Sequence, residues 1–184
     1  MRSRAVAVSG TLFRNPAIHE QSDSDGVEFS FMNDFTRLDR VSIFGNKLSF
    51  LIPHDWVEVF EEDHCLYHPP ETKSGWLRVS LITAKSGDEA PGEHLKKVFD
   101  GKQNVIVDHQ TGNLVSISEK DSEEDGDRIH LYYWIVANVV PPDLVREAVF
   151  SYTVRQDRID KEDTRQMVRL VGELVSQADF SPPV

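Results

Sequence analysis

The chain has 184 residues and a formal net charge of -11 at pH 7, with 39% hydrophobic and 28% charged residues. These values are those of an ordinary globular domain, and a chain of this length buries roughly 70% of its unfolded surface. The negative charge opposes binding to nucleic-acid phosphates or anionic membranes, so we expect neither as a partner. A lone cysteine, Cys65, excludes an intramolecular disulfide, and we expect a cytoplasmic protein.

The N-terminal part of the chain lacks sustained periodicity. The polar run Gln21 to Gly26 has the composition of a loop, so we predict a peripheral arm over residues 1–38 and a single domain over residues 39–184. The apolar stretch Ala5 to Phe13 follows two arginines but is short and lacks a cleavage pattern, which argues against an export signal. No window approaches the roughly 20 apolar residues of a transmembrane helix.

Strand signals begin after the arm. Gly45 and Asn46 separate two short apolar segments, 41–44 and 48–52, and predict a hairpin. Pro53 ends the second strand because it lacks a backbone N–H to donate. An extended segment restarts at Trp56, and residues 65–68 predict a short edge strand.

The middle of the chain alternates strands with one helix. Residues 76–83 place apolar side chains at every second position, as in a strand buried on one face. Leu95, Val98 and Phe99 have helical spacing and predict a short helix that ends at Gly101. Two further strands are predicted over 104–108 and 113–118, followed by an acidic loop over 121–127.

The last third of the chain predicts a hairpin and a closing helix. Residues 129–140 are apolar on both alternating faces, which favours a central strand covered on each side, and 145–154 returns antiparallel beside it. Asp160 is the expected N-cap of the helix. An apolar stripe predicts that this helix lies on the sheet, and it consists of Met167, Leu170, Val171, Leu174 and Val175.

The order of these elements resembles the PsbP fold, which an extrinsic photosystem subunit, a Ran-binding nuclear import factor and uncharacterised bacterial proteins share. The segments that carry the resemblance are SFLIPHDW, GWLRVSLIT, WIVANVV, VFSYTV and the helix ending in Ala178-Asp179-Phe180, within roughly residues 41 to 181. The resemblance implies an α+β fold, a mainly antiparallel sheet flanked by helices in an α/β/α sandwich. It implies proteins that mostly act by binding other macromolecules, and it supplies no binding residue.

A transition-metal site is one interpretation of Asp63, His64, Cys65 and His68. On a strand the two histidines share a face but lie about 13 Å apart, while the thiol points to the opposite face, so one ion would not be chelated. A bend at Pro69 would bring His68 back and keeps the alternative open. We favour ordinary polar and core positions and expect no metal.

A calcium loop is suggested by Asp121, Glu123 and Asp125-Gly126, but the twelfth position is Tyr132 instead of glutamate. A solvated acidic turn is the better interpretation. Nucleophile elbows, phosphate loops and zinc-protease helices are missing from the sequence. Two histidines are conceivable acid-base groups: His109, which lies beside Asp108 in the sequence, and His130, if it faces a carboxylate across the sheet. We assign no catalytic residue and no cofactor.

Two of the three tryptophans begin strands near loop rims, and indole rings are frequent at binding hot spots. Trp56 and Trp76, together with His64 and His68, are therefore the candidate interaction residues, whereas Trp134 is expected in the core. We expect a non-enzymatic protein-interaction module that uses a sheet face or loop rim, in an accessory, assembly or toxin-neutralising role. The alternative is a small hydrolase or ligand-binding enzyme built from separated His and Asp/Glu residues. The sequence names neither the partner nor the oligomeric state.

Overall fold

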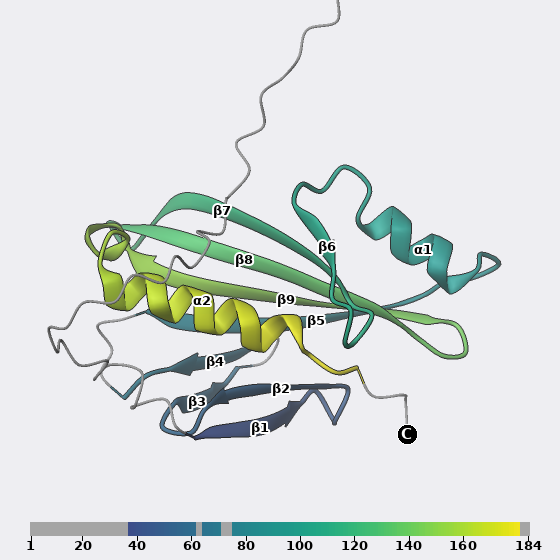
Figure 1. Cartoon of the computed structure of the whole chain (residues 1–184), viewed down its shortest axis with the longest axis horizontal. Helices are drawn as coiled ribbons and strands as arrows, with labels where there is room; N and C mark the ends of the chain where they lie inside the picture. Colours follow the sequence, from purple (N-terminus) through teal and green to yellow (C-terminus); the bar gives the residue numbers. More distant parts are fainter. Residues whose placement is uncertain (1–36, 62–63, 71–74, 181–184) are drawn as a thin grey trace, which may run out of the picture. The chain divides into compact units, whose positions relative to one another are not determined.

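The computed structural model describes residues 37–61, 64–70 and 75–180, which include nine strands and two α-helices (Figure 1). The strands are β1 (Leu38–Ile43), β2 (Leu48–Pro53), β3 (Val57–Phe60), β4 (Cys65–His68), β5 (Trp76–Lys85), β6 (Val105–Val107), β7 (Leu114–Glu124), β8 (Asp127–Val140) and β9 (Leu144–Arg155). The helices are α1 (Pro91–Val98) and α2 (Glu162–Ser176), and a short 3-10 turn, Gln156–Arg158, precedes α2. The predicted arm lies outside the described residues except for residues 37 and 38.

Seven of the strands form one antiparallel sheet in the order β3-β4-β5-β9-β8-β7-β6. The predicted α+β class with a mainly antiparallel sheet is confirmed. The predicted central strand is wrong by one position, because β9 lies in the middle and β8 beside it. The periodicity of β8 is that of a well-packed strand, but strand order depends on long-range pairing that periodicity does not encode. The predicted edge strand β4 is also internal, since β3 pairs along its outer side.

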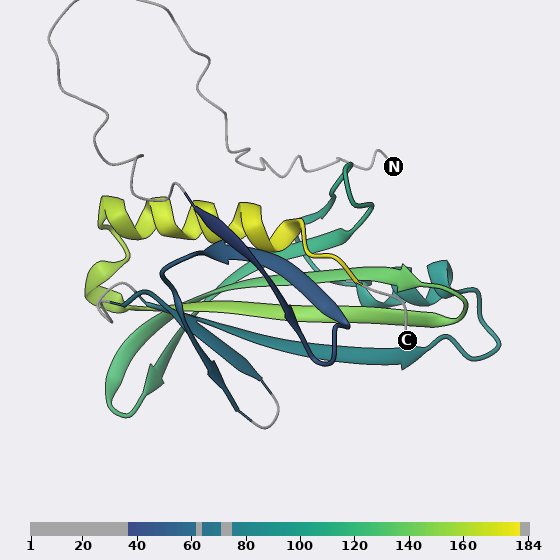
Figure 2. The same ribbon diagram turned by 90° about the horizontal axis from the view of Figure 1, so that it is seen from below.

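The predicted hairpin of β1 and β2 is confirmed, but it forms a separate two-stranded sheet. It packs over a face of the large sheet, beside α2, as Figure 2 shows. Ser49 of β2 exchanges backbone hydrogen bonds with Asp179, at 2.9 and 2.8 Å, which ties the hairpin to the chain after α2. The hairpin therefore adds a layer to the sheet without extending it.

Aromatic packing joins this layer to the sheet. The ring of Phe50 in β2 meets Phe150 of β9 edge-on at 5.2 Å and Tyr67 of β4 at 5.6 Å, measured between ring centroids. The predicted stripe of α2 packs on the same face, and Met167 and Val171 are among its buried members. Burying side chains of this size contributes about 1.5–3 kcal/mol each, so this face holds the main core.

The opposite face carries a smaller cluster at one end of the sheet. Leu95 and Phe99, in and just after α1, pack against Ala137 of β8 and Val145 of β9. The predicted short helix is thus confirmed, beginning at Pro91, a residue that suits the first turn because its missing N–H has no partner there. Helices therefore lie on both faces, as the sandwich prediction requires.

The predicted acidic loop over 121–127 is wrong, because most of it is strand. β7 continues to Glu124 and β8 begins at Asp127, and only Asp125 and Gly126 turn, with φ values of 52° and 84°. Such a pair of positive φ values suits the Asp-Gly turn of a two-residue hairpin. The charged side chains of this hairpin end are exposed to solvent on both faces of the strands. The strands therefore lack the alternation of apolar and polar residues by which a strand is predicted.

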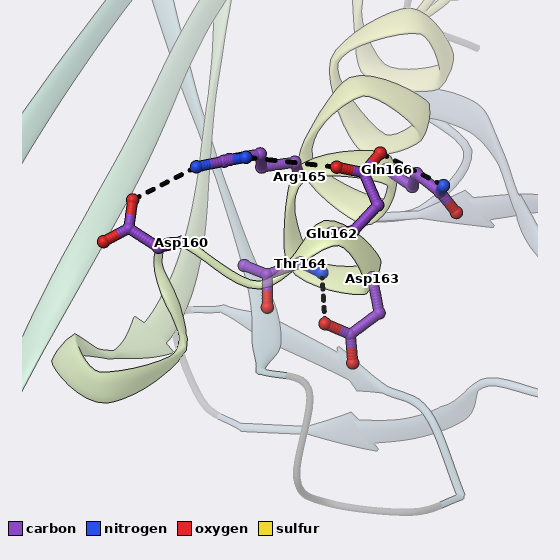
Figure 3. Close-up of polar contacts among 6 residues, drawn as sticks. All are labelled: Asp160, Glu162, Asp163, Thr164, Arg165 and Gln166. Carbon is purple, nitrogen blue, oxygen red and sulfur yellow. Dashed lines mark hydrogen bonds and ion pairs between the residues drawn. The ribbon is translucent and has the colours of Figure 1, made fainter.

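The start of α2 also differs from the prediction. Its N-cap is Lys161, and Asp160 lies one residue before it, where its carboxylate accepts a hydrogen bond from Arg165 at 3.2 Å. Figure 3 shows this pair together with Glu162, whose carboxylate lies 4.0 Å from the same guanidinium. Acidic side chains thus stabilise the positive end of the helix through its first turn instead of through a side-chain cap.

The other end of α2 is held by a buried amide. The Nδ2 atom of Asn113, before β7, donates to the carbonyl oxygens of Ser176 at 3.2 Å and Ala178 at 2.7 Å. Asn138 of β8 in turn donates to the Asn113 side-chain oxygen at 2.8 Å. Helix carbonyls at a C-terminus lack intrahelical partners, so this amide satisfies groups that would otherwise be buried without hydrogen bonds.

Gly75, immediately before β5, tolerates no side chain. A Cβ there would lie 2.4 Å from the carbonyl oxygen of Thr153, and φ is +119°. We expect Gly75→Ala to lower the free energy of unfolding by about 3 kcal/mol or more, because backbone must shift and the φ value is strained. Urea unfolding followed by circular dichroism measures this loss.

Gly87→Ala is the matched control, because Gly87 also has positive φ, +63°, but nothing lies within 4 Å of its added Cβ. It should cost only about 1 kcal/mol, the backbone strain alone. Equal losses for the two variants would show that the close approach of β5 to β9 is not what requires glycine.

Candidate interaction surface

One face of the seven-stranded sheet is only partly covered by the described helices. The hairpin and α2 occupy the first face, and α1 covers only one end of the second. We call the uncovered part of the second face the open face. Strand pairing places these side chains on it: Val57, Val59, Leu66, His68, Trp76, Arg78, Ser80, Ser118, Lys120, Leu131, Tyr133, Val149, Ser151 and Thr153.

The middle of the open face is built from short hydroxyl side chains between long ones. Thr153 of β9 lies opposite Trp76 of β5 and Leu131 of β8. Ser151 also lies in β9, two residues away, between Arg78 and Tyr133. The two hydroxyl residues are 3% and 8% exposed, so a partner that approaches the sheet meets the longer flanking side chains first.

Apolar character continues to the edge of the sheet. Val57 and Val59 of β3 are 43% and 41% exposed, and Leu66 of β4 lies opposite Val59. Branched apolar side chains are common in strands, but they are normally covered on at least one face. Trp76 and Tyr133 add two half-buried aromatic rings to this face, between which the register places Ser151 and Thr153. Partly exposed apolar side chains gathered on one face are typical of interaction sites on globular proteins.

The charges of the open face differ from those of the whole chain. Among the residues named above, Arg78 and Lys120 are the permanently charged ones; both are exposed, and neither forms an ion pair with another described residue. The named residues include no Asp or Glu; Arg155, Glu124 and Asp127 lie on the same face farther along the strands, at the end away from α1. A surface with two unpaired cations therefore lies on a chain whose net charge is -11.

The structure brings together two of the four predicted interaction residues. His68 lies opposite Val57, beside the start of β5, and Trp76 is the first residue of β5; both side chains are half-buried on the open face. The ring nitrogen Nδ1 of His68 is 2.8 Å from the carbonyl oxygen of Pro69. These two residues remain predicted contact residues.

The other two lie elsewhere. Trp56 is only 7% exposed, and its indole stacks on Tyr152 in the main core at a centroid distance of 6.3 Å. His64 precedes β4 and lies 3.2 Å from the carboxylate of Glu61. Trp56 therefore packs in the core, and the rim position inferred from its place at a strand start does not expose it.

A second polar arrangement lies at the far end of β7 and β8, on the face that α2 covers. The Nδ1 atom of His130 is 2.7 Å from the carboxylate of Asp121, and its Nε2 atom is 3.5 Å from Glu119. Tyr132 packs its ring against the imidazole at a centroid distance of 4.7 Å. The His130 imidazole is the main cause that holds the pKa of Asp121 below its usual value.

Next to this pair is a shallow pocket of about 340 Å³, wide open to solvent, lined by Asp121, Ser122, Glu123, Arg128 and Gln156. Its lining side chains suit a small polar ligand. Among the described residues no group of three or more His, Cys, Asp or Glu side chains is arranged to hold a metal ion. The pocket contains no serine-histidine or cysteine-histidine pair at hydrogen-bond distance among the described residues.

Two other ionisable groups belong to the core. Burial raises the pKa of the Cys65 thiol, with a further contribution from Glu58, so the unreactive protonated form is favoured. Burial likewise raises the pKa of Tyr67, and its hydroxyl donates a short hydrogen bond to Glu58. In β4 the Cys65 side chain points into the core, whereas that of His68 lies on the opposite face of the sheet.

Comparison with known proteins relates the chain to others by fold. No protein-family model and no curated protein matches it. A protein from Bacteroides thetaiotaomicron VPI-5482 has a TM-score of 0.52 and 17% identity over 77% of this chain, but the match spans only 47% of that structure. Cyanobacterial PsbP (CyanoP) from Synechocystis sp. PCC 6803 has a TM-score of 0.36 and 15% identity, over 86% of this chain and 98% of that one.

LpqN, a protein involved in cell envelope biogenesis of Mycobacterium tuberculosis, has a TM-score of 0.46 and 12% identity, over 85% of this chain and 100% of that one. The predicted fold-level similarity to PsbP is confirmed by these matches. At such identities a likeness concerns the fold alone. Among the described helices none is long and apolar enough to cross a bilayer, and the cytoplasmic location stays a prediction.

The pairing of His130 with Asp121 predicts a measurable pKa change. We expect His130→Ala to raise the pKa of Asp121 toward the usual aspartate value, because the hydrogen bond that favours the ionised form is lost. In the native chain this carboxyl should therefore stay ionised to lower pH than in the variant. Titration of the side-chain carboxyl carbons by NMR measures both.

Asp108 provides the internal control, since its low pKa comes mainly from the backbone N–H of Thr111 and not from His130. Its titration should be the same in both proteins. An unchanged Asp121 titration in the variant would show that the two side chains do not interact in solution.

Proposed function

We propose that this chain is a non-enzymatic protein-interaction module that holds a protein partner on its open face. The observation that carries the proposal is a group of partly exposed apolar side chains on one face of the sheet that no described helix covers: Val57, Val59, Trp76, Leu131 and Tyr133. A sheet with helices on both faces normally buries such side chains. Their partial exposure is explained if another protein completes the layer.

The composition of this surface supports a protein partner. Trp76 and Tyr133 have rigid, amphipathic rings, and aromatic side chains of this type dominate binding energy at many interfaces. They lie on either side of β9, a strand hydrogen-bonded to neighbours on both sides, so their positions are set by the middle of the sheet. A rigid platform lowers the entropic cost of binding because little has to be ordered.

The alternative function, a small hydrolase or ligand-binding enzyme, has its best support in His130 and Asp121 beside the open pocket. That pocket is shallow and solvated, whereas enzyme pockets usually enclose most of their ligand. The open face is the larger feature and the one whose apolar side chains lack a covering layer. An accessory, assembly or toxin-neutralising role is consistent with a binding platform, and the partner's identity would decide among them.

Site-specific photocrosslinking in cells of the source organism tests the proposal. With p-benzoylphenylalanine in place of Tyr133, irradiation should give one discrete adduct of higher mass, because the probe lies within the interface. The same probe in place of Arg169 is the matched control, since that residue is exposed on α2, which packs on the other face. Gel mobility and mass spectrometry identify the adducts.

A discrete adduct from the first position only is the expected result. The same adducts from both positions would indicate contact without a specific surface, and no adduct from either would contradict an interaction through the open face. Urea unfolding of both labelled proteins checks that the probe itself leaves the fold intact.

A further inference from the structure

The open face has room for one helix. Its residues extend along β9 from Val149 to Thr153 and across five strand spacings from β3 to β7, an area of roughly 14 by 24 Å. An α-helix with its side chains is about 10–12 Å wide and rises about 5.4 Å per turn, so one helix of about four turns fits along the 24 Å dimension.

The fold already shows that this face accepts a helix. α1 packs there through Leu95, supplemented by Phe99 just after it, against Ala137 and Val145. The open face begins where α1 ends its cover, and a second helix laid beside α1 would complete the layer that α2 forms on the other side. Helix-on-sheet packing is therefore the geometry that the free part of this face is shaped for.

Charge gives the chemistry of the helix. Arg78 lies on β5 and Lys120 on β7, so the two unpaired cations stand on opposite sides of the apolar centre around Tyr133. The first carboxylate toward α1 is that of Glu147, half-buried in the row of Ala137, and at the other end of the face the first carboxylates are those of Glu124 and Asp127 at the turn of β7 and β8. A helix with an apolar stripe flanked by carboxylates complements this pattern, whereas a second copy of a chain with net charge -11 does not.

We propose, resting on the proposed function, that the open face binds an amphipathic helix of a partner protein that carries acidic side chains beside its apolar stripe. Leu131, Tyr133 and Trp76 contact the stripe, and Arg78 and Lys120 pair with its carboxylates. The acidic surface of the rest of the chain repels anionic partners, so such partners bind at this face and not elsewhere. The local cations select the helix that the overall charge would repel.

Two labelled synthetic helices of about four turns test this. They share one leucine stripe, and its flanking positions are all glutamate in one peptide and all lysine in the other. Fluorescence anisotropy with the full chain at low ionic strength should show that the glutamate peptide binds about tenfold more tightly, even though the net charge of the chain favours the lysine peptide. The double variant Arg78→Glu with Lys120→Glu should reverse the preference.

Arg169→Glu is the control, because it makes the same kind of charge change on the other face, at an exposed arginine of α2 that forms no ion pair with another described residue. It should leave the ratio of the two affinities unchanged. Two results would contradict the proposal that the bound helix is acidic. One is tighter binding of the lysine peptide to the native chain, and the other is an equal change of the affinity ratio in the control and in the double variant.

The outcomes separate the two proposals. If both peptides bind equally and Tyr133→Ala weakens both, the open face is a binding surface but the acidic chemistry is wrong. If neither peptide binds while crosslinking at Tyr133 succeeds, the proposed function stands and the helix is wrong. If neither peptide binds and crosslinking fails, both proposals are wrong. Urea unfolding of every variant verifies that the native fold is retained.

Discussion

The packing of Phe50 against Phe150 and Tyr67 determines how the rest of the structure is arranged. It places the hairpin of β1 and β2 over one face of the sheet, beside α2, and so concentrates the core on that face. Gly172 of α2 strengthens the same arrangement, because a Cβ there would meet the indole nitrogen of Trp134 at 3.1 Å. With two elements on one face and only the short helix α1 on the other, an uncovered surface in the middle of the sheet is the direct result.

Much of the fold was predictable, because local chemistry specified it. Turn residues such as Gly45 and Asn46, the alternation in β5 and the stripe of α2 each depend on neighbours in sequence. The end of β7 was not predictable from alternation, because Asp121 and its neighbours are charged on both faces. That hairpin end lies in solvent, and its pairing comes from backbone hydrogen bonds and from contacts such as the one with His130. The Asp-Gly pair was the available signal for it.

The open face shows what sequence patterns leave out. Trp76 and His68 could be proposed as contact residues because a strand-initial tryptophan and a nearby histidine stand out in the sequence. Leu131 and Tyr133 could not, since they belong to an apolar run that suggests burial on both faces. Whether a face is covered depends on where α1 and the hairpin pack, which involves residues far away in the chain. For the same reason, alternation along β5 does not reveal that Arg78 belongs to this surface.

The three tryptophans occupy three different environments. Trp134 is buried beneath α2, Trp56 is stacked on Tyr152, and Trp76 is half-buried on the open face. The first two indoles are therefore intrinsic fluorophores for the integrity of the core, while the third faces the surface that a partner would cover. In a chain that keeps only Trp76, indole fluorescence would report whether the open face is covered. A bound partner would make the surroundings of this indole less polar, whereas unfolding would make them more polar, so bound and unfolded molecules would give different signals.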